Sequence, residues 1–217
     1  MSEFFNEVDD AVRREQLKRL WDRYWLVFIA AVMLIIAGVG GWRGYQYVQG
    51  QSAEKAGTAF NQAMRLSDQG KHRQAEAAFA AVAAKSPKGY RTLARLQAAG
   101  QEAALDPKAS AKMYDAIAAD DSVGAEFQAL ARVRAAGLLV DSISYADMKQ
   151  RIGQDTKSDS AFRFTARELL ALSAFRAKDT AAARKWLDMI ALDGETPSGV
   201  RQRAEALQAL LPPIAKS

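Results

Sequence analysis

Few side chains in this sequence are of the types that do chemistry, and their spacing does not predict a catalytic or metal site. The 217 residues include one histidine, His72, and no cysteine. A catalytic imidazole needs an oriented nucleophile and an acid beside it, and a metal ion needs further ligands. The lack of cysteine removes thiol catalysis, cysteine-based zinc sites and disulfide bonds. We therefore expect no catalytic, cofactor-binding or metal-binding residue in this chain.

Acidic pairs and glycine-rich segments also fail to form a reaction centre. Asp120 and Asp121 are adjacent, so they point apart on a helix or lie in a turn and do not make an acid/base pair. Asp155 and Asp159 flank a short linker, and we expect them to cap the helix that follows. The glycines of residues 38–41 lie inside an apolar stretch, which is no place for a phosphate-binding loop. The sequence thus predicts a protein that is not an enzyme.

The composition is that of a folded domain with a modest positive charge. Hydrophobic residues make up 49% of the chain and charged residues 25%, and the net charge is +5. Residues 1–23 carry five Lys or Arg against six Asp or Glu, so the positive excess lies in the rest of the chain. This excess suits anionic headgroups or acidic partners, but an ordinary mixture of solvated helix faces is the favoured interpretation. Because the basic residues are scattered, nucleic acid is not expected as a partner.

One apolar stretch is long enough to cross a lipid bilayer. Residues 24–42 contain no charged side chain and are bounded by Arg23 and Arg43. A helix of about 20 apolar residues spans a hydrocarbon core of about 30 Å. Trp25 and Trp42 are amphipathic rings suited to the two headgroup levels, and Arg43 follows at the interface. The sequence predicts a transmembrane helix over residues 24–45.

Positive charge before this helix sets its predicted orientation. Five basic residues precede it closely and few follow it, which keeps the N-terminus in the cytoplasm and places the C-terminal domain in the periplasm. A cleaved signal peptide is the alternative, but its apolar core would be shorter, and residues 50–53 are a poor cleavage site. The Arg13-Arg14 pair resembles a twin-arginine export signal, but Trp21-Asp22-Arg23 and a very hydrophobic run follow it. We expect an uncleaved, single-pass inner-membrane anchor.

The flanking segments are expected to be short. Residues 1–23 read as a helical cytoplasmic segment that is either a docking tail or only a topology signal. Residues 46–55 read as a brief linker or a helical exit, which keeps the next domain near the bilayer, and residues 212–217 as a tail. Small residues late in the apolar stretch would let another helix approach, although such spacings also arise by chance. These possible helix–helix contacts are Ala37, Gly40, Gly41 and Gly44.

From residue 53 the sequence is helical throughout, with no alternating β-branched run that could form a sheet. The helices come in pairs, and the first pair, residues 56–69 and 73–85, fits the roughly 34-residue tetratricopeptide template. Small residues let the two helices approach, glycine makes the turn, and an aromatic ring fills the groove toward the next repeat. The residues expected to pack this repeat are Ala63, Leu66, Gly70, Ala75 and Phe79.

Later pairs match the template less well. They are expected at 93–105 with 109–119, 126–140 with 145–152, and 160–177 with 181–192, and a capping helix at 198–211 ends the domain. Tyr114 takes the position of Phe79 in the second unit, and Trp186 adds bulk in the fourth. The predicted fold is therefore all-α: one N-terminal transmembrane helix, then a degenerate tetratricopeptide-like α-solenoid of about four repeats over residues 56–211.

The order of these parts resembles a known family. A charged N-terminus, one membrane helix ending in Gly41-Trp42-Arg43 and an Ala-rich repeat domain are similar to the ancillary SecYEG translocon subunit family of the YfgM type, over nearly the whole chain. The resemblance implies a non-enzymatic inner-membrane protein that associates with Sec translocon subunits and with a membrane-anchored periplasmic chaperone of the isomerase type, assisting exported polypeptides. The N-terminal segment, with Phe4-Phe5 and Arg13-Arg14, departs from the family's best-known form, so a regulatory role is not carried over.

Three functions from different classes remain compatible with the sequence. The first is a scaffold or chaperone-like protein at the translocon, binding a peptide or partner helix on the concave face of the repeats. The second is a structural adaptor of another cell-envelope complex that binds a partner protein through the same helices. The third, an enzyme or ligand-binding protein, has no residue pattern in its favour.

Overall fold

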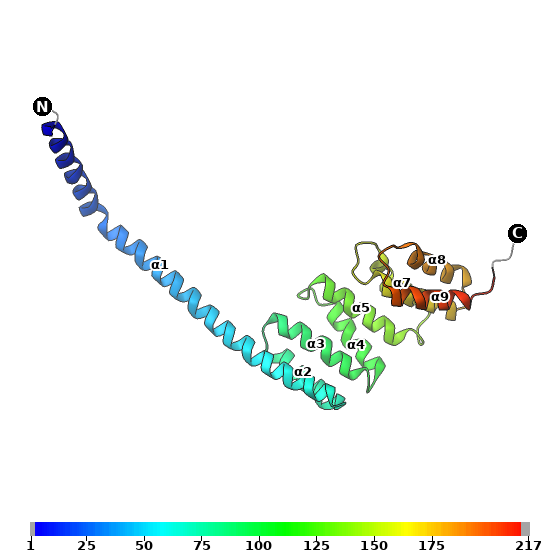
Figure 1. The fold of residues 1–217 in the computed structure, drawn as a ribbon. Helices are drawn as coiled ribbons and strands as arrows, with labels where there is room; N and C mark the ends of the chain where they lie inside the picture. The colour runs from blue at the N-terminus through cyan, green and yellow to red at the C-terminus, as the bar shows by residue number, and fades with distance from the viewer. Residues whose placement is uncertain (1–2, 214–217) are drawn as a thin grey trace. The chain divides into compact units, whose positions relative to one another are not determined.

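The structure is a computed structural model that describes residues 3–213, with the side chains of Lys18, Trp21 and residues 23–213. The described residues form α-helices and one 3-10 helix, with no strand, which confirms the all-α class (Figure 1). The chain divides into two compact units, Met1–Ser52 and Ala53–Ser217. The ends of the predicted cytoplasmic segment and tail, residues 1–2 and 214–217, lie outside the described residues.

The elements are α1 (Glu3–Asp68), α2 (His72–Lys85), α3 (Lys88–Glu102), α4 (Pro107–Ala118), α5 (Ala125–Leu139), α6 (Tyr145–Ile152), η1 (Gly153–Thr156), α7 (Arg163–Arg176), α8 (Thr180–Leu192) and α9 (Ser198–Ala209).

The first unit consists of α1 residues up to Ser52. From Arg23 onward α1 contains a stretch with a mean hydropathy of 2.3, none of which is buried. By length and composition this helix can cross a membrane, where exposed apolar side chains face lipid instead of water. Trp25 and Trp42 are exposed on it. A Cβ atom built on Gly40, Gly41 or Gly44 would meet no atom within 4 Å, so no described part of this chain covers the small-residue face.

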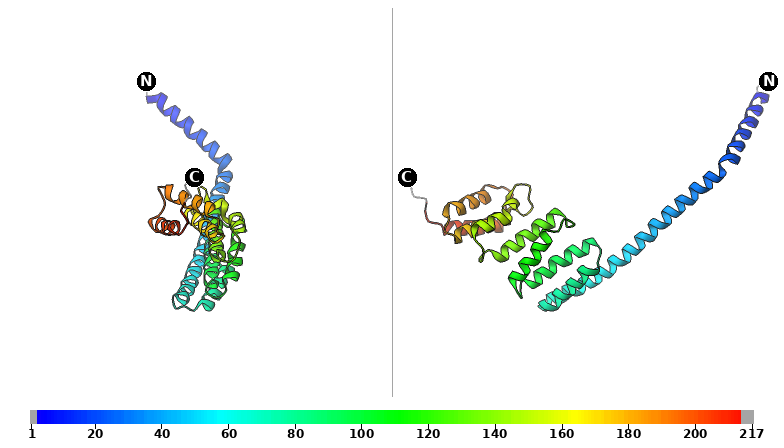
Figure 2. Two further views of the ribbon diagram at one scale, coloured as in Figure 1. Left: turned by 90° about the vertical axis from the view of Figure 1, so that its right-hand side faces the viewer. Right: turned by 180° about the vertical axis from the view of Figure 1, so that it is seen from behind.

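The second unit is a stack of helix pairs in which consecutive helices lie side by side (Figure 2). Its first pair is the end of α1 with α2, and Ala63, Ala75 and Phe79 are fully buried between them. Gly70 turns the chain with a φ of 71°, a left-handed conformation that costs glycine little. The Lys71 amide then donates to the Leu66 carbonyl at 3.0 Å and closes the end of α1.

Aromatic rings join this first pair to α3. The Phe60 ring lies 5.2 Å from that of Phe79 in an edge-on contact and 6.0 Å from that of Tyr90. Such contacts between rings add to the free energy gained from burying their area. Gly57 faces the same cluster, because a Cβ atom there would come within 2.9 Å of the Tyr90 hydroxyl. The first repeat is thus closed by one aromatic cluster, and a side chain at residue 57 would require the Tyr90 ring to shift.

The later helix pairs also have buried cores, but these cores contain residues that differ from the template. Ser110, at a position where the template has alanine, is fully buried and donates its hydroxyl to the Ala99 carbonyl at 2.6 Å. Tyr114 and Ile117 fill the core between α3, α4 and α5. Leu170, Leu187 and the mostly buried Trp186 belong to the last cluster, and the Trp186 indole N–H donates to the Tyr145 hydroxyl at 2.9 Å.

The expectation that Asp155 and Asp159 cap the next helix is wrong. Asp155 is 3% exposed and receives two hydrogen bonds from the Arg132 guanidinium, at 2.9 and 2.7 Å. A buried carboxylate must be paired, and this arginine on α5 provides the bidentate partner that holds η1 in place. The N-cap of α7 is Phe162, which makes no side-chain capping bond, and its amide donates to the Ser160 hydroxyl instead of Asp159.

A second carboxylate, Asp193, joins α7 to the chain after α8. Its Oδ2 atom accepts hydrogen bonds from Arg167 at 2.8 Å and Arg163 at 3.1 Å. Arg167 is buried and also donates to the carbonyls of Thr156 and Met189. The hydrogen bonds from Arg167 and Arg163 lower the pKa of Asp193 from 3.8 to about 2.

We predict that Phe79→Ala lowers the free energy of unfolding by about 3–5 kcal/mol, because it leaves a cavity in a fully buried site. Urea unfolding of the chain in detergent micelles measures this. The matched control is Leu192→Ala, at a leucine that is 85% exposed, which should change stability by less than about 0.5 kcal/mol. Equal effects of the two substitutions would show that Phe79 is not a core residue.

We also predict a pH-dependent contribution from Asp193. Because its pKa is lower in the folded chain than the ordinary 3.8, the contribution is complete above that value and is lost as the pH falls through about 2. The difference in urea midpoint between the native chain and Asp193→Asn should therefore be constant near neutral pH and shrink below about pH 4. Asp159→Asn is the matched control, because it removes an exposed carboxylate that pairs with no arginine among the described residues. A difference that persists undiminished at pH 2 would contradict the assignment.

Candidate functional site

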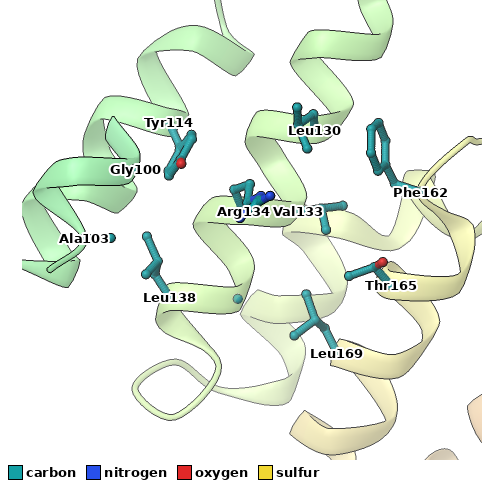
Figure 3. A pocket seen from close by; sticks show the side chains of 11 residues that line it. Gly100, Ala103, Tyr114, Leu130, Val133, Arg134, Leu138, Phe162, Thr165 and Leu169 are labelled. Carbon is teal, nitrogen blue, oxygen red and sulfur yellow. The ribbon is translucent and has the colours of Figure 1, made fainter. Parts of the chain in front are cut away.

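A groove lined mainly by apolar side chains crosses one face of the repeat domain. It consists of a hollow of about 480 Å³ and an adjoining hollow of about 230 Å³, and four residues line both: Gly100, Tyr114, Leu130 and Arg134. Figure 3 shows α5 in the middle of the larger hollow, with Tyr114 and Gly100 on one side and Phe162, Thr165 and Leu169 on the other. The remaining lining residues are Leu93, Leu96 and Gln97 of α3, Ala103 directly after α3, and Phe127, Val133, Gly137 and Leu138 of α5.

The pattern of α5 explains why apolar side chains face outward here. Leu130, Arg134 and Leu138 are four residues apart and so follow one side of the helix. Most buried positions of α5 are alanines, with Ala131 and Ala135 fully buried, and Val133 is the one larger side chain among them. Small side chains let the neighbouring helices approach closely, and they leave the larger leucines on the groove side. Phe127, at the start of the same side, is 39% exposed.

Tyr114 forms the floor of the groove where the two hollows meet. It comes from α4 and its side chain is 5% exposed. A Cβ atom on Gly100 would lie 3.3 Å from its hydroxyl, so the glycine leaves room for the phenol to reach the groove. Burial raises the pKa of Tyr114, and the positive charge of Arg134 acts in the opposite direction. Tyr114 and Arg134 both line the two hollows, which places the guanidinium on the same part of the groove as the phenol.

Arg134 is the one charged side chain among the groove residues. It is exposed, and it forms no hydrogen bond or ion pair with any other residue that the structure describes. Several other arginines of the repeat domain are paired with carboxylates, among them Arg95 with Asp120, Arg151 with Asp115, and Arg203 with Glu168. The groove thus presents a single cation, available to a partner, within an apolar surface.

The residues singled out in the sequence occupy three different places. Ala63, Ala75 and Phe79 are buried in the first repeat, and Trp186 lies in the last core cluster. The small residues at 37, 40, 41 and 44, with Trp25, Trp42 and Arg43, are exposed on α1. Tyr114 is the member of the repeat-packing set that also reaches the groove.

His72 has a structural place. It begins α2, and its Nδ1 atom lies 2.9 Å from the Gln101 side-chain oxygen; the Gln101 amide donates to the Ser67 hydroxyl at 2.8 Å. No group of three or more metal-ligating side chains occurs among the residues that the structure describes. The groove leucines and Arg134 were not found from the sequence, although the spacing of residues 130, 134 and 138 opposite buried alanines was a usable signal.

The fold and the uncovered groove define an α-helical repeat protein of the class that serves as an interaction scaffold. A family model described as the tetratricopeptide repeat-like domain matches residues 18–186, and the chain belongs to this family. No curated protein and no solved structure matches the chain. The family establishes the repeat architecture, and the groove is the surface on which a partner protein can be sought.

We predict that Arg134→Gln raises the pKa of Tyr114, because the nearby positive charge favours the phenolate and its removal disfavours it. Spectrophotometric titration of the tyrosines, compared with the same titration of Tyr114→Phe, isolates this phenol. Arg73→Gln, which removes an exposed arginine on α2, is the charge-matched control and should leave the titration unchanged. A Tyr114 curve that moves to lower pH in Arg134→Gln would contradict the proximity of the two groups.

Proposed function

We propose that this protein is a non-enzymatic, membrane-anchored scaffold with a chaperone-like role in protein export. Its N-terminus lies in the cytoplasm, α1 crosses the inner membrane, and the repeat domain lies in the periplasm. There it associates with Sec translocon subunits and with a membrane-anchored chaperone of the isomerase type, and its groove receives segments of exported polypeptides or of these partners.

The observation that carries the proposal is the apolar groove across α3, α5 and α7. Leu93 and Phe127 are 41% and 39% exposed at one end of it, in a domain whose other large side chains mostly pack into three core clusters. Apolar surface that is left uncovered and hollowed favours a protein partner. Unfolded or newly exported segments are rich in the apolar side chains that such a groove binds, and the repeat family supports the same class of function.

The membrane side of the proposal is supported by the composition and exposure of α1. Its apolar stretch is uncharged between Arg23 and Arg43, and the basic residues that precede it favour a cytoplasmic N-terminus. The uncovered small residues at 37, 40, 41 and 44 suit close contact with another helix within the bilayer. The translocon as the particular neighbour rests on the resemblance carried by the Gly41-Trp42-Arg43 exit and the order of parts.

We predict that photo-crosslinkers placed at residues 37, 40, 41 and 44 in the membrane-embedded chain give adducts with Sec subunits or with the isomerase-type chaperone, identified by mass spectrometry. The small-residue face permits close helix contact and should therefore react more than the opposite face of the same helix. Crosslinkers at residues 35 and 39 on that opposite face are the control. Adducts with lipid or with a second copy alone, or with proteins of another envelope complex, would contradict the translocon assignment.

A further inference from the structure

The position of Arg134 within the groove limits what the groove can bind. Arg134 lines both hollows, so it stands where they meet and not at either end. Apolar side chains continue on both sides of it, with Leu93, Leu96 and Phe127 in the smaller hollow and Leu138, Phe162 and Leu169 in the larger one. A ligand that fills both hollows must present apolar groups on either side of whatever meets the guanidinium.

Charge complementarity then specifies the group that meets Arg134. The groove contains no acidic side chain, and the guanidinium has no partner among the described residues. Removing water from an unpaired cation is costly, so an occupant that covers Arg134 is favoured if it supplies an anion that can accept its hydrogen bonds. One cation in an apolar channel does not suit a nucleic acid, whose binding needs many phosphate contacts.

We infer that the groove binds a polypeptide segment that carries one aspartate or glutamate in its interior, with apolar residues on both sides, and that Arg134 pairs with this carboxylate. The inference rests on the proposed function, because it names the chemistry of the segment that the groove receives. An internal acidic residue fits better than a C-terminal carboxylate, because a chain end at Arg134 would leave one apolar hollow empty. The carboxylate sets the register of the segment, and the flanking side chains supply the apolar contact area.

The test uses the full chain in detergent micelles and two fluorescein-labelled peptides. One peptide has a central aspartate flanked by leucines on both sides, and its partner has asparagine in place of the aspartate. Fluorescence anisotropy should show that the aspartate peptide binds about three- to tenfold more tightly, with a preference that weakens as salt is added. Arg134→Gln should abolish this preference, so that the variant binds the aspartate and asparagine peptides with equal affinity. Arg73→Gln, the charge-matched change on α2, should keep the preference.

A further variant separates failure of this inference from failure of the proposed function. Thr165 is an exposed groove residue, so Thr165→Trp fills the groove without disturbing the core and should weaken both peptides. If Thr165→Trp weakens the binding of both peptides while Arg134→Gln leaves the preference between them unchanged, the groove binds peptides without recognising a carboxylate. Only the present inference is then overturned.

Two other outcomes would overturn more. Peptides whose binding ignores both Thr165→Trp and Arg134→Gln, or no binding at all, would overturn the groove as a peptide site and the proposed function with it. A dimer that Thr165→Trp dissociates in sedimentation would make a second copy of the chain the occupant, against the inference. Thermal melting of each variant verifies the fold. The melting temperatures should match that of the native chain, because both side chains are exposed and unpaired among the described residues.

Discussion

Close approach of helices through alanine is the constraint on which the repeat domain depends. Ala63, Ala75, Ala94 and Ala99 are fully buried, as are alanines in each later helix pair. A methyl group buries little area, so each contact contributes little by itself. What small side chains permit is a short distance between helix axes, over which many weak contacts add up. The few large residues fill the space that remains between the helices. Phe79 does so in the first repeat, where its loss would leave a cavity that the neighbouring alanines cannot fill.

Ion pairs replace template packing where the repeats are least regular. Arg132 with Asp155, and Arg167 with Asp193, connect segments that are far apart in the sequence, around the 3-10 helix and the end of α8. Each carboxylate accepts more than one hydrogen bond from guanidinium groups, which offsets the desolvation of the buried charges. Arg132 bonds both oxygens of Asp155, and Arg163 and Arg167 both bond one oxygen of Asp193. Two bonds to one carboxylate restrict the direction in which an irregular segment leaves its helix.

The same alanine packing also produces the groove that we propose as the binding surface. On α5 the small residues face the core, and Leu130 and Leu138 therefore point into the groove with Arg134 between them. An ordinary amphipathic helix buries its leucines, whereas the fully buried residues of this helix are alanines and its leucines are at most partly buried. A groove formed in this way is part of the solenoid itself, which connects the degeneracy of the repeats with the role of an interaction scaffold and with the acidic, apolar segment proposed as its ligand.

The sequence by itself determined what depends on neighbouring residues. Helical periodicity, the turn at Gly70 and the uncharged run 24–42 specified an all-α repeat chain with one apolar helix, and the expected third pair, 126–140 and 145–152, lies within one residue of α5 and α6. Tertiary structure alone decided the rest. Asp155 resembled a helix cap because its sequence neighbours allow one, but the fold brings Arg132 against it from another helix. In the sequence, Arg134 is indistinguishable from other surface arginines. Only the packing of α3, α5 and α7 places it in the groove. Which charges find partners depends on how distant helices stack, and the local sequence does not specify that.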